Sequence, residues 1–191
     1  MNDGLAVRVN EPLSRHTALR TGGVCDAWVV VHRLEALAHM LADCREAGWK
    51  YTVLGAGTRV VVWDGSFPGV VFRLGTDFAH LESVDGGFSA GAAVPVVAVV
   101  AAARDAGLRG IESFAAVQGS LGASLALDEG WSDWVSSVRF LHRGKVREGP
   151  ADEVLGGKRI VLGATLRLAQ GDPAKIAKDI SKRLADDHPG S

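Results

Sequence analysis

The chain has 191 residues, 47% apolar and 23% charged, a composition typical of a folded globular protein rather than a disordered one. A formal net charge of -1, without any block of five like charges, gives no general attraction to nucleic acid or to an anionic membrane. Two cysteines, Cys25 and Cys44, are too few for a disulfide framework and lack metal-ligand spacing. We therefore expect no metal site, and a location in the reducing cytoplasm.

The first half of the chain predicts four strands and one helix. After an irregular start, residues 26–31 have the β-branched and aromatic content of a buried strand. Residues 34–47 carry apolar side chains at helical spacing. Short apolar runs predict further strands at 51–54, 59–63 and 70–74.

The second half predicts one hairpin, two strands and three helices. In chain order these are strands 81–84 and 87–90 around the turn Asp85-Gly86, a helix that begins near Pro95, a short helix at 121–127, strands 135–141 and 160–168, and an amphipathic helix from Pro173. The longest uncharged run contains Pro95 and several glycines, so it does not predict a membrane span. The whole pattern predicts an α+β fold with two lobes that share a cleft.

Two glycine-rich turns next to apolar runs carry the functional signal. They are Leu54-Gly55-Ala56-Gly57-Thr58-Arg59 and Val117-Gln118-Gly119-Ser120-Leu121-Gly122-Ala123-Ser124. Glycine permits positive φ and close approach of a ligand, and consecutive free N–H groups suit a pyrophosphate. No amphipathic helix is predicted after the first turn, which disfavours an NAD-binding Rossmann unit. The alternative is that each turn only connects its strands.

Five stretches follow one another along the chain. They are Asn10-Glu11-Pro12-Leu13-Ser14-Arg15-His16-Thr17 with Arg20-Thr21-Gly22-Gly23, Leu54 to Arg59, Asp64-Gly65-Ser66-Phe67-Pro68-Gly69-Val70-Val71, Ala90-Gly91-Ala92, and Gly107-Leu108-Arg109-Gly110-Ile111-Glu112 with Gln118-Gly119-Ser120-Leu121-Gly122. In this order they resemble one family, the UDP-N-acetylenolpyruvoylglucosamine reductases of peptidoglycan synthesis, known as MurB. The resemblance covers roughly residues 8 to 170.

The resemblance implies a two-lobe FAD-binding fold like that of MurB and the PCMH-type flavoproteins. It divides the chain into a first FAD-binding lobe at 1–76, a second at 77–170 and a C-terminal helix or tail at 171–191. The cofactor implied is FAD. The residues implied to bind it are Leu54, Gly55, Ala56, Gly57, Thr58, Arg59, Gly119, Ser120, Gly122 and Ala123.

The chain also departs from the family pattern. The C-terminal substrate domain of the family has no counterpart after Leu168, and residues 151–158 lack the family's tyrosine and arginine that contact the substrate. Arg59 stands where the family has asparagine, and Asp128-Glu129-Gly130 replaces an Asn-Ala-Gly motif near the flavin. Two carboxylates beside a diphosphate would repel it unless they point away. We therefore predict a truncated protein with a degenerate active site and assign no catalytic residue.

Two classes of function stay open at this stage. The chain is expected to be either an FAD-dependent NAD(P)H oxidoreductase that does not reduce the family's substrate alone, or a non-catalytic module that senses a flavin or nucleotide or docks on a protein. Self-association through the face left by the missing domain is a further expectation. Arg20, Arg59 and Arg73 are either ligand contacts or surface ion pairs. Trp131 and Trp134 either pack in the core or cover a flavin edge or a protein partner.

Overall fold

A computed structural model describes residues 4–157 and 159–187 of the chain. Within this part the strands are β1 (Leu5–Pro12), β2 (Val24–Val31), β3 (Lys50–Val53), β4 (Phe67–Leu74), β5 (Leu81–Val84), β6 (Gly87–Gly91), β7 (Leu108–Arg109), β8 (Val135–His142), β9 (Lys145–Gly149), β10 (Ile160–Arg167) and β11 (Ala169–Gln170). The helices are α1 (Leu34–Glu46), α2 (Val96–Asp105), α3 (Leu121–Leu127) and α4 (Pro173–Asp187). Short 3-10 turns lie at Leu13–Arg15, Thr76–Phe78, Glu112–Phe114, Glu129–Trp131 and Ala151–Val154.

The first sheet is mixed and has the strand order β1-β2-β4-β3. β1 pairs with β2 in antiparallel register, whereas β2 and β3 both run parallel to β4. Helix α1 covers one face, where Leu37 and Leu41 pack against Val29 and Phe72. Because β3 and β4 are parallel neighbours, the segment 54–66 must return along the sheet, and it carries the first glycine-rich bend.

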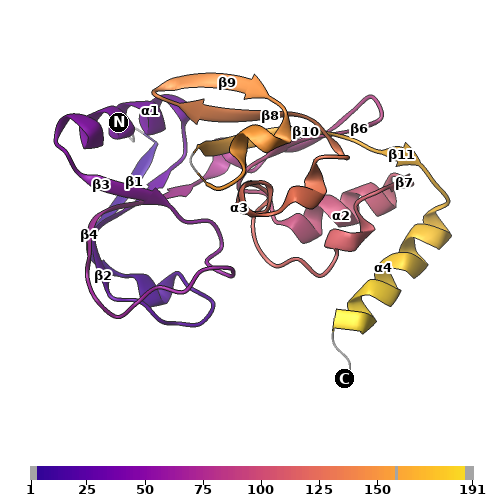
Figure 1. Ribbon diagram of the computed structural model, residues 1–191, viewed down its shortest axis with the longest axis horizontal. Helices are drawn as coiled ribbons and strands as arrows, with labels where there is room; N and C mark the ends of the chain where they lie inside the picture. Colours follow the sequence, from indigo (N-terminus) through magenta and orange to yellow (C-terminus); the bar gives the residue numbers. More distant parts are fainter. Residues whose placement is uncertain (1–3, 158, 188–191) are drawn as a thin grey trace.

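The second sheet is antiparallel throughout, in the order β5-β6-β10-β8-β9. Helices α2 and α3 pack on it, while α4 extends at the end of the molecule opposite the first sheet (Figure 1). The strands β7 and β11 form a separate two-stranded ladder between α2 and α4. The two main sheets thus come from residues 5–74 and 81–167, and the domain boundaries expected after residues 76 and 170 stay predictions.

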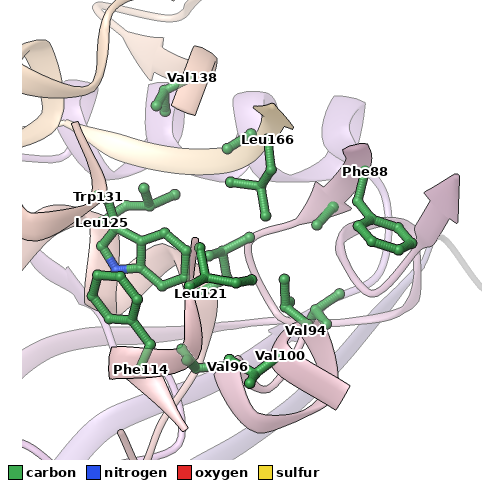
Figure 2. Close-up of a cluster of buried hydrophobic side chains, with 14 of the residues drawn as sticks. Phe88, Val94, Val96, Val100, Phe114, Leu121, Leu125, Trp131, Val138 and Leu166 are labelled. Carbon is green, nitrogen blue, oxygen red and sulfur yellow. The ribbon is translucent and has the colours of Figure 1, made fainter. Parts of the chain in front are cut away.

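The largest core lies between the second sheet and its helices. Figure 2 shows Trp131 stacked on Phe114, with Leu121 and Leu125 of α3 beside them. The two rings have centroids 3.9 Å apart and are tilted by 15°. The buried Trp131 Nε1 donates to Ser124 Oγ at 2.9 Å, so its polar atom is satisfied. Trp131 therefore packs in the core, and Trp134, which is partly buried, packs against it.

A second core joins the two sheets. Leu141 of β8, Leu162 of β10 and Phe78 pack with the side chains between α1 and the first sheet. This shared core fixes the two sheets relative to each other. It therefore also fixes the relative positions of the loops that leave them.

Three local predictions were wrong, for reasons visible in the structure. Residues 59–63 are an irregular segment and not a strand, since both neighbouring positions beside β4 are already taken by β2 and β3. β1 was expected to be irregular and β9 was not predicted at all. Both are edge strands whose side chains are mostly exposed, so neither carries the apolar pattern that marks a buried strand.

No helix in the described part of the chain is both long and apolar enough to cross a bilayer. Helix α4, the longest, has charged residues along most of its exposed face and buries Ile176 against the second lobe.

Replacing Trp131 by alanine should lower the free energy of unfolding by about 3–5 kcal/mol, because the change leaves a cavity in the main core and breaks the stack on Phe114. Urea denaturation followed by far-UV circular dichroism measures the loss. The control is Trp63→Ala, since Trp63 is 85% exposed, and this variant should stay within about 0.5 kcal/mol of the wild type. Equal losses in the two variants would contradict the described core.

Candidate functional site

The two glycine-rich bends lie directly against each other. A Cβ added to Gly55 would be 2.5 Å from Ser120 Oγ and 3.7 Å from Ala123 Cβ, so close approach requires glycine at 55. The Thr58 hydroxyl donates a hydrogen bond to the Gln118 carbonyl oxygen at 3.0 Å. These contacts join residues about 60 positions apart in the chain. The convergence that a shared ligand would need is therefore present.

The first bend presents a run of backbone N–H groups. Within the described part of the chain, no hydrogen-bond acceptor faces the amides of residues 55–59. The amide of Leu54, one residue earlier, donates to the Phe72 carbonyl oxygen at 2.9 Å and so continues the sheet pairing. Because consecutive N–H groups in a bend make a concave donor surface, this segment suits an anion such as a phosphate.

The second bend contributes fewer donors than the sequence suggests. The Gly122 amide donates to the Ala92 carbonyl oxygen at 2.9 Å, so it has no free hydrogen for a ligand. The amides of Gly119, Ser120 and Ala123 have no acceptor among the described residues. Gly122 instead permits close packing, since a Cβ there would lie 2.7 Å from that of Ala92.

The backbone around His16 packs against the first bend. Gly57 has a φ of +69°, and a Cβ on it would collide with the carbonyl oxygen of His16. The Ala18 amide donates to the Gly57 carbonyl oxygen at 2.9 Å. His16 itself stacks on the buried Trp28, with ring centroids 3.7 Å apart and an angle of 9° between the rings. The position of the bend therefore depends on the segment that contains His16.

The His16 ring is held by a buried carboxylate. His16 Nε2 donates to Glu11 Oε1 at 2.9 Å, and Arg8 Nη1 lies 3.3 Å from the same oxygen. The Glu11 side chain is only 7% exposed. The hydrogen bond from His16 lowers the pKa of Glu11 below its usual value, and the neighbouring Arg8 and Arg15 lower it further, although burial opposes them. His16 is thus a hydrogen-bonded structural residue.

Two cavities flank the contact between the bends. We call the first, of about 410 Å³, the arginine-lined cavity, because Arg45, Arg73, Arg143 and Arg159 line it. We call the second, of about 320 Å³, the apolar cavity; Leu13, Val60, Val62, Phe67 and Leu127 are among its lining residues. Residues 52–56 together with Gly119, Ser120 and Ala123 line both. The bends therefore form a wall common to two cavities, each of the size usual for small-molecule sites.

The acidic residues that raised a doubt about an anion site differ in their placement. Asp128 Oδ1 accepts a hydrogen bond from the Gly130 amide at 3.0 Å and so turns toward its own backbone. The Glu129 side chain lies outside the described residues. Neither cavity has an aspartate, glutamate or cysteine among its described lining residues.

The structure also shows the surroundings of the two cysteines and of three arginines. Cys25 and Cys44 are fully buried free thiols, and burial raises the pKa of both, so they behave as small core residues. Arg20, Arg59 and Arg73 have no carboxylate within ion-pair distance among the described residues. The described residues contain no group of three metal-ligating side chains.

The sequence comparison decides the family. No family model matches the chain. A UDP-N-acetylenolpyruvoylglucosamine reductase from Geobacter metallireducens is 31% identical to this chain in an alignment 207 residues long. The alignment covers 96% of this chain and 69% of the relative. The chain belongs to this reductase family.

A second reductase of this family, from Pelobacter propionicus, is also 31% identical, over 189 residues that cover 92% of this chain. The chain spans 64% of that relative's length, and 41% of the length of the relatives from Halalkalibacterium halodurans and Bacillus subtilis. The family predicted from the five sequence stretches is thereby confirmed.

Solved structures confirm the fold class as well. The MurB reductase from Thermus caldophilus matches with a TM-score of 0.78 at 22% identity, over 95% of this chain and 68% of that one. CrmK, a flavoenzyme of caerulomycin biosynthesis, matches with a TM-score of 0.60 at 14% identity, over 89% of this chain and 42% of that one. The fold is therefore the predicted α+β fold of MurB and the PCMH-type proteins.

Replacing Glu11 by glutamine should destabilise the protein at pH 7 and do so less as the pH falls. The folded-state pKa of Glu11 is lowered, so its ionised form stabilises the fold above the unfolded-state pKa of about 4.3. That stabilisation disappears as the pH falls through the lower, folded-state value. Urea denaturation of both proteins at several pH values between 7 and 3 measures the difference.

The control for this series is Glu82→Gln on the exposed surface of β5, which should leave the unfolding free energy nearly unchanged at every pH. A difference between wild type and Glu11→Gln that stays constant with pH would contradict the ionised Glu11–His16 contact.

Proposed function

We propose that this chain binds FAD across its two cavities, with the diphosphate of the cofactor held by the backbone amides of the bends. The observation that carries the proposal is the run of N–H groups at residues 55–59, which lack an acceptor in the described structure. The glycine at 55 and the positive φ at 57 keep side chains off this surface. A diphosphate has enough acceptor oxygens for several of these donors.

The second bend completes the donor set. Gly119, Ser120 and Ala123 offer amides to the same ligand, and Ser120 adds its hydroxyl. Leu54 and Gly122 belong to the proposed site through packing alone, because their N–H groups are used within the fold. The side chain of Thr58 is committed to the second bend, so it contributes its amide.

The two cavities differ in a way that suits the two ends of FAD. The apolar cavity, with Leu13, Val62 and Leu127 among its walls, suits the large planar isoalloxazine ring. The arginine-lined cavity then takes the adenosine. A bound flavin supplies two-electron redox chemistry, while the described residues supply binding, orientation and exclusion of water.

Family membership supports a role related to peptidoglycan precursor synthesis in the cytoplasm. The relatives are reductases by name, and one structural neighbour is named as a flavoenzyme. Since the chain spans about two thirds or less of these relatives, the activity and the substrate of the full-length reductases are part of the proposal and not of the comparison. Two buried free cysteines fit a reducing compartment.

We further propose that the described part of the chain does not complete the family's reaction alone. Residues 151–158, where the resemblance implies a tyrosine and an arginine that contact the substrate, contain neither. The ionisable groups of the described cavity lining are arginines, Tyr51 and His142. The lack of the two substrate contacts favours the second candidate function, a module that binds the flavin without catalysis.

Titration of the purified chain with FAD, followed by the flavin absorbance and fluorescence, tests the proposal. The variant Ala123→Leu should weaken binding by at least about tenfold, because the larger side chain fills the space where both cavities meet Gly55. The control Ala174→Leu lies on the exposed start of α4 and should bind like the wild type. Thermal denaturation of each variant confirms that it is folded.

The response of the bound flavin to NADPH separates the two candidate functions. Bleaching of the bound flavin by NADPH supports an oxidoreductase, whereas binding without bleaching supports a non-catalytic module. A wild-type chain that remains without flavin after incubation with excess FAD overturns the proposal.

A further inference from the structure

The arginine-lined cavity carries more positive charge than binding of a flavin dinucleotide to backbone amides requires. Four arginines line it and no carboxylate does, among the described residues. The chain as a whole has a net charge of -1, so this concentration is local. Like charges gathered on one concave wall repel one another unless an anion lies between them.

One of the four arginines is already neutralised. Arg159 forms an ion pair with Glu153 at 2.7 Å, donates to the backbone carbonyl of the same residue, and lies over the Phe140 ring. Arg45, Arg73 and Arg143 have no carboxylate within ion-pair distance in the described part of the chain. These three guanidinium groups are therefore the ones available to a ligand.

Arg45 is held in place by the fold. Its Nε donates to the Leu41 carbonyl oxygen, one helical turn earlier in α1, at 2.9 Å. One terminal nitrogen of its guanidinium lies 3.3 Å from the position that a Cβ on Gly144 would occupy. Arg45 thus rests against the β8–β9 turn, whose other residue is Arg143. Two arginines far apart in sequence are brought to the same place.

The local conformation of Arg143 is unfavourable for arginine. Residues 143 and 144 form the two-residue turn between paired His142 and Lys145, and both have positive φ, at 50° and 77°. This is the type I′ pattern, in which asparagine followed by glycine is strongly preferred. An arginine at a position where the backbone disfavours it suggests a role other than folding.

We infer that Arg45, Arg73 and Arg143 form a binding site for a phosphate group, separate from the amides of the two bends. Neither α1 nor the β8–β9 hairpin contributes to the apolar cavity, so the site belongs to one end of the cleft only. Guanidinium groups pair with phosphate oxygens through two parallel hydrogen bonds. The phosphate is either free inorganic phosphate or a phosphate on the ribose of an adenosine nucleotide that takes the place of the FAD adenosine in the same cavity.

Calorimetric titration of the full chain with inorganic phosphate, 5′-ADP and adenosine 2′,5′-bisphosphate tests this site. The last two ligands carry two phosphates each but differ in their position. Arg143→Asn and Arg45→Gln should each weaken the phosphate-dependent binding by about tenfold, as expected for loss of one charged hydrogen-bonding group. Arg139→Gln is the control, because Arg139 is exposed on β8 and lines neither cavity.

The melting temperature gives a second readout. Because asparagine suits the turn better than arginine, Arg143→Asn should melt at the same temperature as the wild type or higher, while it binds phosphate less well. Arginine-dependent binding of inorganic phosphate identifies the free anion as the ligand, and arginine-dependent preference for the 2′,5′-bisphosphate over 5′-ADP identifies the nucleotide. Equal affinities in all three variants and the wild type, for every ligand, would overturn the inference.

This inference goes beyond the proposed flavin function and fails separately from it. Ala123→Leu changes the wall that both cavities share, whereas Arg143→Asn changes a turn that touches only one. A wild type that binds FAD but shows no arginine-dependent phosphate binding loses the anion site and keeps the flavin site. The reverse result keeps the anion site alone.

Discussion

The site depends on one close approach, the contact of the Gly55 backbone with Ser120. Any side chain at 55 would push the two bends apart, since even a methyl group would lie 2.5 Å from the serine hydroxyl. The Thr58–Gln118 hydrogen bond fixes the register of the same contact. Each bend alone would be an ordinary connection between elements; held together, they present amides from two halves of the chain to one volume.

The bends were predictable from the sequence, but their support was not. Glycine clusters next to apolar runs are a local signal, and so are the family-like stretches that contain them. The stack of His16 on Trp28 and the buried Glu11 pair residues through the fold, and a single histidine has no spacing that announces such a contact. The one clue to the contact between Glu11 and His16 was that both residues lie within the same stretch of the resemblance, Asn10 to Thr17.

The same distinction explains the rest of the comparison between sequence and structure. Helices α1 and α3 and the hairpin at Asp85-Gly86 follow local rules of periodicity and turn chemistry, and they formed where those rules predict. The segment 59–63 has β-forming residues, but β2 and β3 occupy both sides of β4, the strand that follows it, so tertiary pairing overrode its propensity. The positive charge of the arginine-lined cavity comes from positions 45, 73 and 143, which only the folded chain brings together. The net charge of -1 for the whole chain gives no sign of it.

The core shared by the two sheets has a consequence for how a ligand enters and leaves. Leu141 and Leu162 sit in the apolar layer under α1, so rotating one lobe away from the other would expose that layer to water, at about 25 cal/mol for each Å². Hinge opening is therefore costly. A ligand of the cleft would therefore have to pass while the lobes stay together, beside the segment 54–66, which is mostly exposed between its backbone hydrogen bonds at Gly57 and Trp63.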